Sequence, residues 1–588
     1  MHSANELVTS DRDAKQSPTT LIQVTLTILA GAAVYGLFFN RGVWLSVIAY
    51  SIAPAERVLH GEVPYRDFLF NYTPGILWLN ALLMKFFGVG LMPVHIGLLL
   101  FKVLTLVTLS FLSGKLIRGW LSLAPVALTL SWLGHRYIFN VHPTQYSMLF
   151  VLLGLVFMLK YEEAGSKRWL FLCGLAIGAV FVFKYNVGLA LLGLGSGALL
   201  LREWIKSNSN DSPARAVSMP VRRLMIMLTG FGVIAAAMLV HLASKGALIP
   251  MIAHFLHHAA DYSEERAVGL PSIRLALPCL VASAVAVGAA IVLARKAPAL
   301  AGVFVIAVVA LGATIILIPG RGLLFKDSAS AAVAYLPPAL FSVIAIWLIW
   351  SAKSSFRSRE LLKEWWSRNG SLIVVLVFAL GAYSEVYPRA DYYHLVRVLP
   401  PVFLLGALAA HRIGAEFASR LGAASRSTQA AWLCSAAPLI VLAAVGIDAT
   451  WRPQFEGGFN LIDRTPIAVD RAEGVRTNPR DAEMIEEMTR LITSNSAEGD
   501  SMFSFARRGG GFYFLANRKN PTKLLWWDSV GIGDEDRGEP PRMMAEGRLK
   551  LVLIPDNLSE QGVFRRILDA DYHSIGRIAG IEVYSRND

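Results

Sequence analysis

Apolar segments of about 20 residues recur through the first three quarters of this 588-residue chain and constrain its fold more than any other feature. A helix of about that length crosses the hydrocarbon core of a bilayer. We predict thirteen spans, at 20–40, 91–114, 121–134, 146–159, 169–183, 186–201, 224–243, 275–294, 298–319, 332–352, 371–387, 396–410 and 430–448. Two pairs of spans are separated by only a few residues, at Lys184 and at Asp391.

The composition also favours a membrane protein. Hydrophobic residues make up 55% of the chain and charged residues 16%, against about 25% charged in soluble domains. This balance excludes a disordered chain, a collagen-like fibre and a plain soluble enzyme. The net charge of +13 divides into +16 over residues 1–449 and −3 over residues 450–588. We therefore expect membrane lipids, and no nucleic acid, as partners of the basic part.

The distribution of Lys and Arg predicts an orientation. Basic residues concentrate in the short head 1–19 and in alternate connecting segments, including 202–223, 353–368 and 412–426. We expect these on the cytoplasmic side of the membrane. An odd number of spans over 20–449 then places 450–588 outside the cytoplasm.

The segment 450–588 reads as a small α/β domain. An amphipathic helix is predicted at 479–494, buried strands at 501–505 and 549–554, a helix at 558–568, and a closing hairpin at 573–578 and 581–585. The acidic stretch 531–542 contains Pro and Gly and is expected to be a mobile loop. Five cations are expected on a solvated face or against anionic headgroups: Arg507, Arg508, Arg518, Lys519 and Lys523.

The first outer loop, residues 41–75, is long for a simple connector, and an apolar stretch of only about 12 residues, 76–87, follows it. That length suits an interfacial or re-entrant helix better than a span. A long loop beside such a helix resembles an active-site lid, with an ordinary solvated loop as the alternative.

Ionisable residues gather near the predicted outer ends of the spans. Such residues at membrane depth usually line a polar cavity, although individual long cations also anchor span ends by snorkelling. Cations with a few carboxylates suit an anionic headgroup and a proton-accepting base. The set comprises Glu56, Glu62, Arg66, Asp67, Arg136, His142, Lys184, Arg389, Asp391, His394 and Arg397.

Three other patterns are weaker. His254, His258 and Asp261 share a helix face at metal-ligand spacing, but an amphipathic surface helix is the simpler interpretation. The run Arg507–Gly511 suggests a phosphate nest or, more simply, a turn. Three cysteines scattered through apolar runs predict neither a disulfide framework nor a metal site.

Three motifs carry a resemblance. Residues 59–68 read LHGEVPYRDF and are followed by YTPG at 72–75; FKYNVG stands at 183–188 and RADYYHL at 389–395. Together they resemble the GT-C superfamily of membrane glycosyltransferases, in the bacterial branch related to protein mannosyltransferases and aminoarabinose transferases. The span layout and the outer C-terminal domain also resemble that group.

The resemblance implies inverting transfer of a sugar from a polyprenyl-phosphate donor to a glycan, lipid or protein acceptor. A first-loop carboxylate would act as general base. Cations, or a divalent metal ion, would stabilise the departing lipid phosphate. The resemblance also implies the substrate-binding residues Tyr65, Arg66, Arg136, His142, Lys184, Arg389, Asp391 and His394.

One departure concerns the base. Relatives carry an Asp about a dozen residues before the glycine that corresponds to Gly61, whereas this chain has LSVIAYS at 45–51. The base would then be Asp67, Glu56 or Glu62, of which we favour Asp67. A transporter or flippase of lipid-linked sugars and a non-catalytic relative are the alternative functions.

Overall fold

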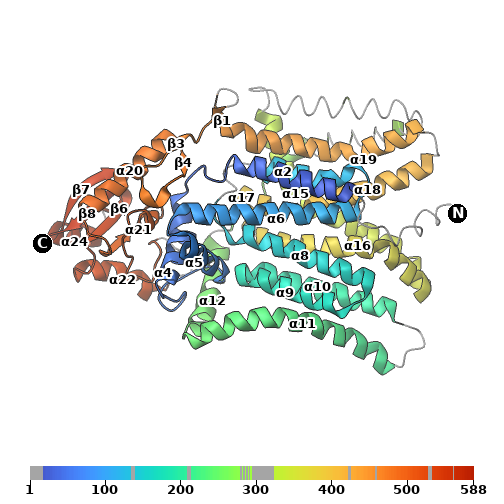
Figure 1. Cartoon of the computed structure of the whole chain (residues 1–588), viewed down its shortest axis with the longest axis horizontal. Coiled ribbons are helices and arrows are strands. Elements are labelled where there is room, and N and C mark those ends of the chain that lie inside the picture. The colour runs from blue at the N-terminus through green and yellow to red at the C-terminus, as the bar shows by residue number, and fades with distance from the viewer. Residues whose placement is uncertain are drawn as a thin grey trace.

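The computed structural model describes residues 18–133, 140–207, 213–265, 267–278, 323–421, 425–456, 460–527, 533–559 and 562–587, with isolated positions between 281 and 307. Figure 1 shows long helices side by side, with a smaller C-terminal unit at one end of the bundle. The predicted class, a polytopic helical membrane protein with a small C-terminal α/β domain, is confirmed. The spans predicted at 275–294 and 298–319 lie almost wholly outside the described residues.

The long helices overlap the predicted apolar segments, except α12, which lies between two predicted spans and covers the segment expected to be an amphipathic surface helix. They are α2 (Pro18–Gly36), α6 (Leu91–Leu116), α7 (Ala124–Leu133), α8 (Pro143–Ala164), α9 (Lys167–Phe183), α10 (Tyr185–Lys206), α11 (Pro213–Ser244), α12 (Leu248–Glu265), α15 (Leu323–Ala352), α16 (Arg359–Tyr383), α18 (Leu399–Leu421) and α19 (Ser425–Gly446). Within the described residues, five helices are long and apolar enough to cross a membrane, so the count of thirteen stays a prediction.

Burial separates inner from outer helices. In the most apolar part of α16, 72% of the residues are buried, against 22% for α11. The outer helices instead expose large aliphatic side chains, such as Val240 and Ile249. In a soluble protein the exposed face of a helix is polar, whereas here it is apolar, so the outer surface of the bundle is suited to lipid. The largely buried α16 lies inside the bundle.

The segments predicted to be cytoplasmic meet at one end of the bundle. Arg202 at the end of α10 pairs with Glu162 at the end of α8 (Nε–Oε1 2.7 Å). Glu162 also accepts a hydrogen bond from Trp366 of α16 (3.1 Å). Lys115 at the end of α6 pairs with Glu163 (2.7 Å). This agrees with the predicted grouping of the basic segments.

The first loop occupies the opposite end and is largely helical. It contains α3 (Leu45–Val47), the π-helical turn η1 (Ile48–Ile52), α4 (Ala53–Leu59) and, after an extended stretch, the predicted short helix α5 (Gly75–Phe87). The C-terminal domain adjoins this loop (Figure 1). Backbone hydrogen bonds join the two, from Gly42 to Arg476 and from Leu69 to Lys523 (both 2.8 Å).

The C-terminal domain holds a four-stranded sheet of order β5-β6-β8-β7. Its strands are β5 (Met502–Ser504), β6 (Leu551–Pro555), β7 (Tyr572–Ile578) and β8 (Ile581–Arg586), and only the β5–β6 pair is parallel. Its helices are α20 (Pro479–Ser494), α21 (Phe512–Leu515), α22 (Asp534–Ala545), α23 (Asp556–Ser559) and α24 (Gly562–Asp571), and two short strand pairs, β1 (Phe455–Glu456) with β2 (Asn460–Leu461) and β3 (Thr465–Pro466) with β4 (Arg476–Thr477), precede it. The predicted helix 479–494, the two buried strands and the hairpin are all present.

The prediction of a loop over 531–542 is wrong from Asp534 onward, because α22 begins there. Three acidic residues in its first turn stabilise the helix, because their negative charges lie at the positive end of the helix dipole. Lys523 also holds this helix, since its backbone N–H donates to Glu539 (3.0 Å) and its ammonium pairs with Asp536 (3.5 Å). These contacts offset the two prolines inside the helix, Pro540 and Pro541.

The glycine run is a turn, as the simpler interpretation holds. The 3-10 turn η9 (Gly509–Gly511) packs directly on the first loop. A Cβ at Gly511 would lie 2.7 Å from the Leu45 carbonyl oxygen, and one at Gly510 would lie 3.0 Å from Ala49. The glycines thus allow the C-terminal domain to approach the backbone of α3 and η1 closely.

Candidate active site

The three first-loop carboxylates are each held by an arginine. Asp67 accepts two hydrogen bonds from Arg66 (2.7 and 2.8 Å) and one from the Val63 N–H (2.7 Å). The Arg66 guanidinium holds the pKa of Asp67 below its usual range, so it is a weaker base than a free aspartate.

Glu56 and Glu62 are bound in the same way. Glu56 pairs with Arg471 of the C-terminal domain (2.7 Å) and Glu62 with Arg57 (2.6 Å). None of the three predicted bases contacts the polar cluster described below, within the part of the chain that the structure covers. Their contacts fasten the loop to itself and to the C-terminal domain.

A second group of polar residues, which we call the polar cluster, lies where the first loop meets the helix bundle. Most of its members are buried, and they come from the loop and from four breaks between helices. The cluster consists of Tyr72, His142, Lys184, Glu385, Asp391, His394 and Arg397.

Lys184 is the centre of the first half of the cluster. It interrupts the helix at the α9–α10 boundary in an extended conformation, which confirms the predicted break there. Its ammonium pairs with Glu385 (3.1 Å) and lies 4.1 Å from the centroid of the Tyr72 ring. Glu385, in the turn after α16, also accepts a hydrogen bond from Thr144 (2.8 Å). The ammonium is therefore held between a buried carboxylate and an aromatic face.

His142 links this half to the next. Its Nδ1 accepts from the Thr144 N–H and caps α8 (3.3 Å), and its Nε2 lies 3.4 Å from the Tyr72 hydroxyl. Burial, together with the charges of Arg397 and Lys184, lowers the pKa of His142 well below the histidine range. It is therefore neutral near pH 7.

Asp391 and His394 stand in one turn at the start of α17 (Tyr392–Arg397), again at a predicted break. The Asp391 carboxylate accepts hydrogen bonds from the backbone N–H (3.0 Å) and ring Nδ1 (2.8 Å) of His394, and it also pairs with Arg389. Burial acts to raise the pKa of Asp391, but His394 and Arg389 outweigh it and hold that pKa well below its usual range. The His394 ring faces that of His142, with centroids 6.3 Å apart.

Arg397 ends α17 one turn after His394 and is 7% exposed. Its Nη2 donates to the Asn140 side-chain oxygen (3.1 Å). Among the described residues, no carboxylate pairs with Arg397. A buried guanidinium beside a neutral amide leaves positive charge for an anion to meet.

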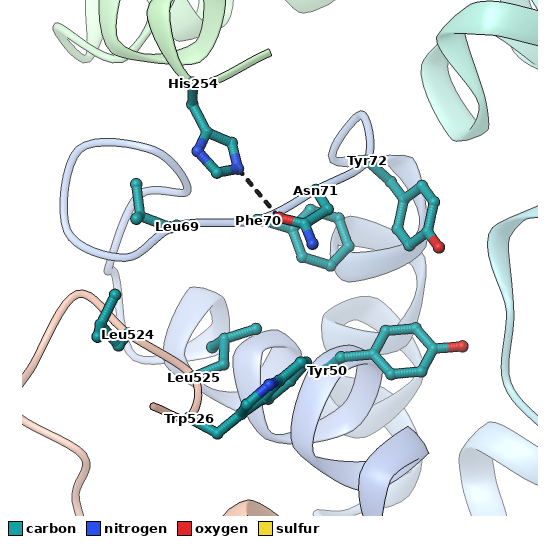
Figure 2. A pocket seen from close by; sticks show the side chains of 9 residues that line it. All are labelled: Tyr50, Leu69, Phe70, Asn71, Tyr72, His254, Leu524, Leu525 and Trp526. Atoms are coloured by element: carbon teal, nitrogen blue, oxygen red, sulfur yellow. Dashed lines mark hydrogen bonds between the residues drawn. The ribbon is translucent and has the colours of Figure 1, made fainter. Parts of the chain in front are cut away.

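A pocket opens between the first loop and the C-terminal domain, next to the polar cluster. Its lining residues are Tyr50, Leu69, Phe70, Asn71, Tyr72, His254, Leu524, Leu525 and Trp526. Figure 2 shows His254 above the loop, bonded to Asn71 (3.0 Å), and Trp526 on the opposite side beside Tyr50. Tyr72 belongs to both the pocket and the polar cluster, so the two adjoin at this residue, whose ring also contacts Lys184.

The remaining predicted residues have other surroundings. Tyr65 is buried, and its hydroxyl donates to the Tyr72 carbonyl (2.5 Å), so it supports the loop. Arg136 lies outside the described residues, as do the side chains of His258 and Asp261. The described residues contain no group of three His, Cys, Asp or Glu able to hold a metal ion. In the C-terminal domain Arg518 is neither solvated nor at a lipid face, because it is buried against Ser496.

The sequence interpretation missed Glu385. It lies inside the predicted span 371–387, and a carboxylate within an apolar segment is itself a signal for a polar site.

Comparisons with known proteins find similarity to a protein family and to a solved structure. The family model described as dolichyl-phosphate-mannose-protein mannosyltransferase matches residues 71–221. ArnT from Cupriavidus metallidurans, solved as a crystal structure bound to undecaprenyl phosphate, is 12% identical over 97% of this chain and 98% of its own, with a TM-score of 0.49. The comparison with curated proteins found no match. The family match supports the resemblance over residues 71–221, a stretch that holds Tyr72, His142 and Lys184.

Proposed function

We propose that this protein is a membrane glycosyltransferase that moves a sugar from a polyprenyl-phosphate donor to an extracytoplasmic acceptor with inversion. The observation that carries the proposal is a buried cation of the polar cluster that has no counter-charge. Arg397 is buried beside the Asn140 amide and pairs with no carboxylate among the described residues, whereas Lys184 pairs with Glu385. A phosphate group would supply the missing negative charge.

The family description adds the class of donor, a lipid phosphate that carries a sugar. In the proposed reaction Lys184 and Arg397 bind the phosphate oxygens. They stabilise the charge that develops as the bond from the anomeric carbon to the phosphate oxygen breaks. His142, which is neutral, places an imidazole beside the phosphate and repels neither cation.

The acceptor side of the reaction is assigned to the pocket at the domain boundary. Trp526 and Tyr50 line it with aromatic rings, and Asn71 supplies an amide. Such a lining suits a hydroxylated molecule, because rings pack on sugar or lipid carbons and amides bond to hydroxyls. A glycan, a lipid or a protein all present acceptors of this kind. The proposed setting is a bacterial inner membrane with the C-terminal domain outside the cytoplasm.

The test is transfer by the purified protein in detergent. A panel of polyprenyl-phosphate sugars is incubated with envelope glycolipids, and release of polyprenyl phosphate is measured. Mass spectrometry of lipids and glycans from a deletion strain supplies the native acceptor. We expect Lys184→Met and Arg397→Met to lose most of the turnover, whereas Arg565→Met, an exposed cation of the C-terminal domain, retains it. Unchanged turnover in both cluster variants would contradict the proposal, and substrate uptake into proteoliposomes without transfer would favour a transporter.

A further inference from the structure

The turn from Asp391 to His394 holds an aspartate–histidine dyad. The Nδ1 of His394 lies 2.8 Å from one carboxylate oxygen of Asp391, and the backbone N–H of His394 donates to that same oxygen (3.0 Å). Because a carboxylate only accepts, Nδ1 carries the proton in this bond. The neutral imidazole then presents an unprotonated Nε2, which is the tautomer that a general base requires.

The surroundings leave that nitrogen available. Within the described residues, the titratable or charged groups in contact with His394 are Asp391 in its own turn and the His142 ring from the segment before α8. The His394 side chain is 14% exposed, so it is sheltered but reachable. His142 contacts Tyr72, whose ring faces Lys184. The dyad therefore adjoins the proposed phosphate site.

The first-loop carboxylates are poorer candidates for a base. Asp67 uses both oxygens on Arg66 and Val63. Glu56 is committed to the C-terminal domain through Arg471. Asp391 is itself paired with Arg389 through its other oxygen, but among the described residues the His394 ring contacts no cation, so its Nε2 can accept a proton.

We infer that His394 is the catalytic base of the transfer and that Asp391 positions it. This inference rests on the proposed function. The acceptor hydroxyl oxygen forms a bond to the anomeric carbon while its proton passes to Nε2 of His394. The bond from that carbon to the donor phosphate oxygen breaks, and its electron pair leaves with the polyprenyl phosphate. The imidazolium, stabilised by Asp391, later returns the proton to solvent.

The test compares His394→Ala and Asp391→Asn with a matched control, His573→Ala. His573 also bonds a side-chain oxygen through Nδ1 (Asn587, 2.8 Å), but it is exposed in the C-terminal domain. We expect His394→Ala to lower kcat by about 10²- to 10⁴-fold, the usual contribution of a general base, with little change in the KM for the donor. Added imidazole should restore part of the rate. Asp391→Asn should lower kcat as well while preserving the helix cap, since Asn caps helices as well as Asp does.

The pH profile separates a base from a structural residue. Wild-type kcat should rise with pH along a limb that His394→Ala lacks and His573→Ala retains. A higher donor KM with unchanged kcat would make His394 a phosphate ligand and overturn the inference, as would a reduced rate with the same pH limb and no imidazole rescue. Normal turnover by His394→Ala would sink the inference alone, whereas inactive wild-type protein with every donor would sink the proposed function.

Discussion

The Lys184–Glu385 ion pair gives the sharpest test of the polar cluster. The two side chains are 8% and 0% exposed and lie 3.1 Å apart. Removing one partner of a buried pair leaves an uncompensated charge and costs about 3–5 kcal/mol, whereas replacing both partners costs much less. We expect Glu385→Gln and Lys184→Met each to destabilise by about 3–5 kcal/mol. Because Gln preserves an acceptor for Thr144, most of the Glu385→Gln loss comes from the stranded ammonium.

The assay is a double-mutant cycle on unfolding in mixed detergent and SDS micelles, with a coupling energy read from the four proteins. The double variant should recover at least half of either single loss. The exposed pair Arg565–Asp569 serves as the matched control and should show coupling below about 1 kcal/mol. Additive losses at Lys184 and Glu385 would refute the reasoning, because the two charges would then be solvated separately.

Three further predictions concern the site and its support. Arg397→Met should weaken binding of polyprenyl phosphate about 10- to 100-fold, since a hydrogen bond to a charged group contributes about 1.5–3 kcal/mol; titration calorimetry measures it. Gly511→Ala should expose residues 45–59 to amide exchange, because its Cβ would meet the Leu45 carbonyl at 2.7 Å, while Gly533→Ala, with open space, should not. The lowered pKa of Asp391 means that its stabilisation is complete above about pH 4, the ordinary aspartate value, and is lost as pH falls through the folded value. Within the acidic range in which pepsin is active, cleavage of 389–397 should therefore increase progressively as pH falls below about 4, whereas Asp391→Asn should be cleaved at a rate that lacks this increase.

The sequence predicted several helix boundaries and the C-terminal hairpin correctly because these features depend on residues close together in the chain. The helix boundaries at Lys184 and Asp391 follow from a polar residue between two apolar runs. The hairpin of β7 and β8 follows from alternation around Ala579 and Gly580. Each of these features depends on neighbours within a few positions of the chain. The same reasoning failed at α22, where long-range contacts of Lys523 outweigh the local proline signal.

The polar cluster depends on partners far apart in the sequence. Lys184 meets Glu385 only because α9, α10 and the end of α16 come together in the bundle. Likewise, nothing near Glu56 indicates that Arg471 of the C-terminal domain binds it. A sequence shows which charged residues reach the same membrane face. It does not show which of them neutralise one another, and that pairing decides which carboxylates remain available for chemistry.

The segment where the resemblance implies an acid is filled in this chain by other contacts. The turn η1 (Ile48–Ile52) is buried, with Ala49 under Gly510, and the Ser51 hydroxyl donates to the Val141 carbonyl (2.9 Å). Tyr50 turns its ring toward Tyr72 and His142. An acid at these positions would be desolvated against a carbonyl oxygen, at a high cost. If the chain transfers sugars to hydroxyls, its proton acceptor must therefore lie elsewhere around the same site. The His142 ring contacts Tyr50 and also contacts the ring of His394, which is the residue that we infer to be the base.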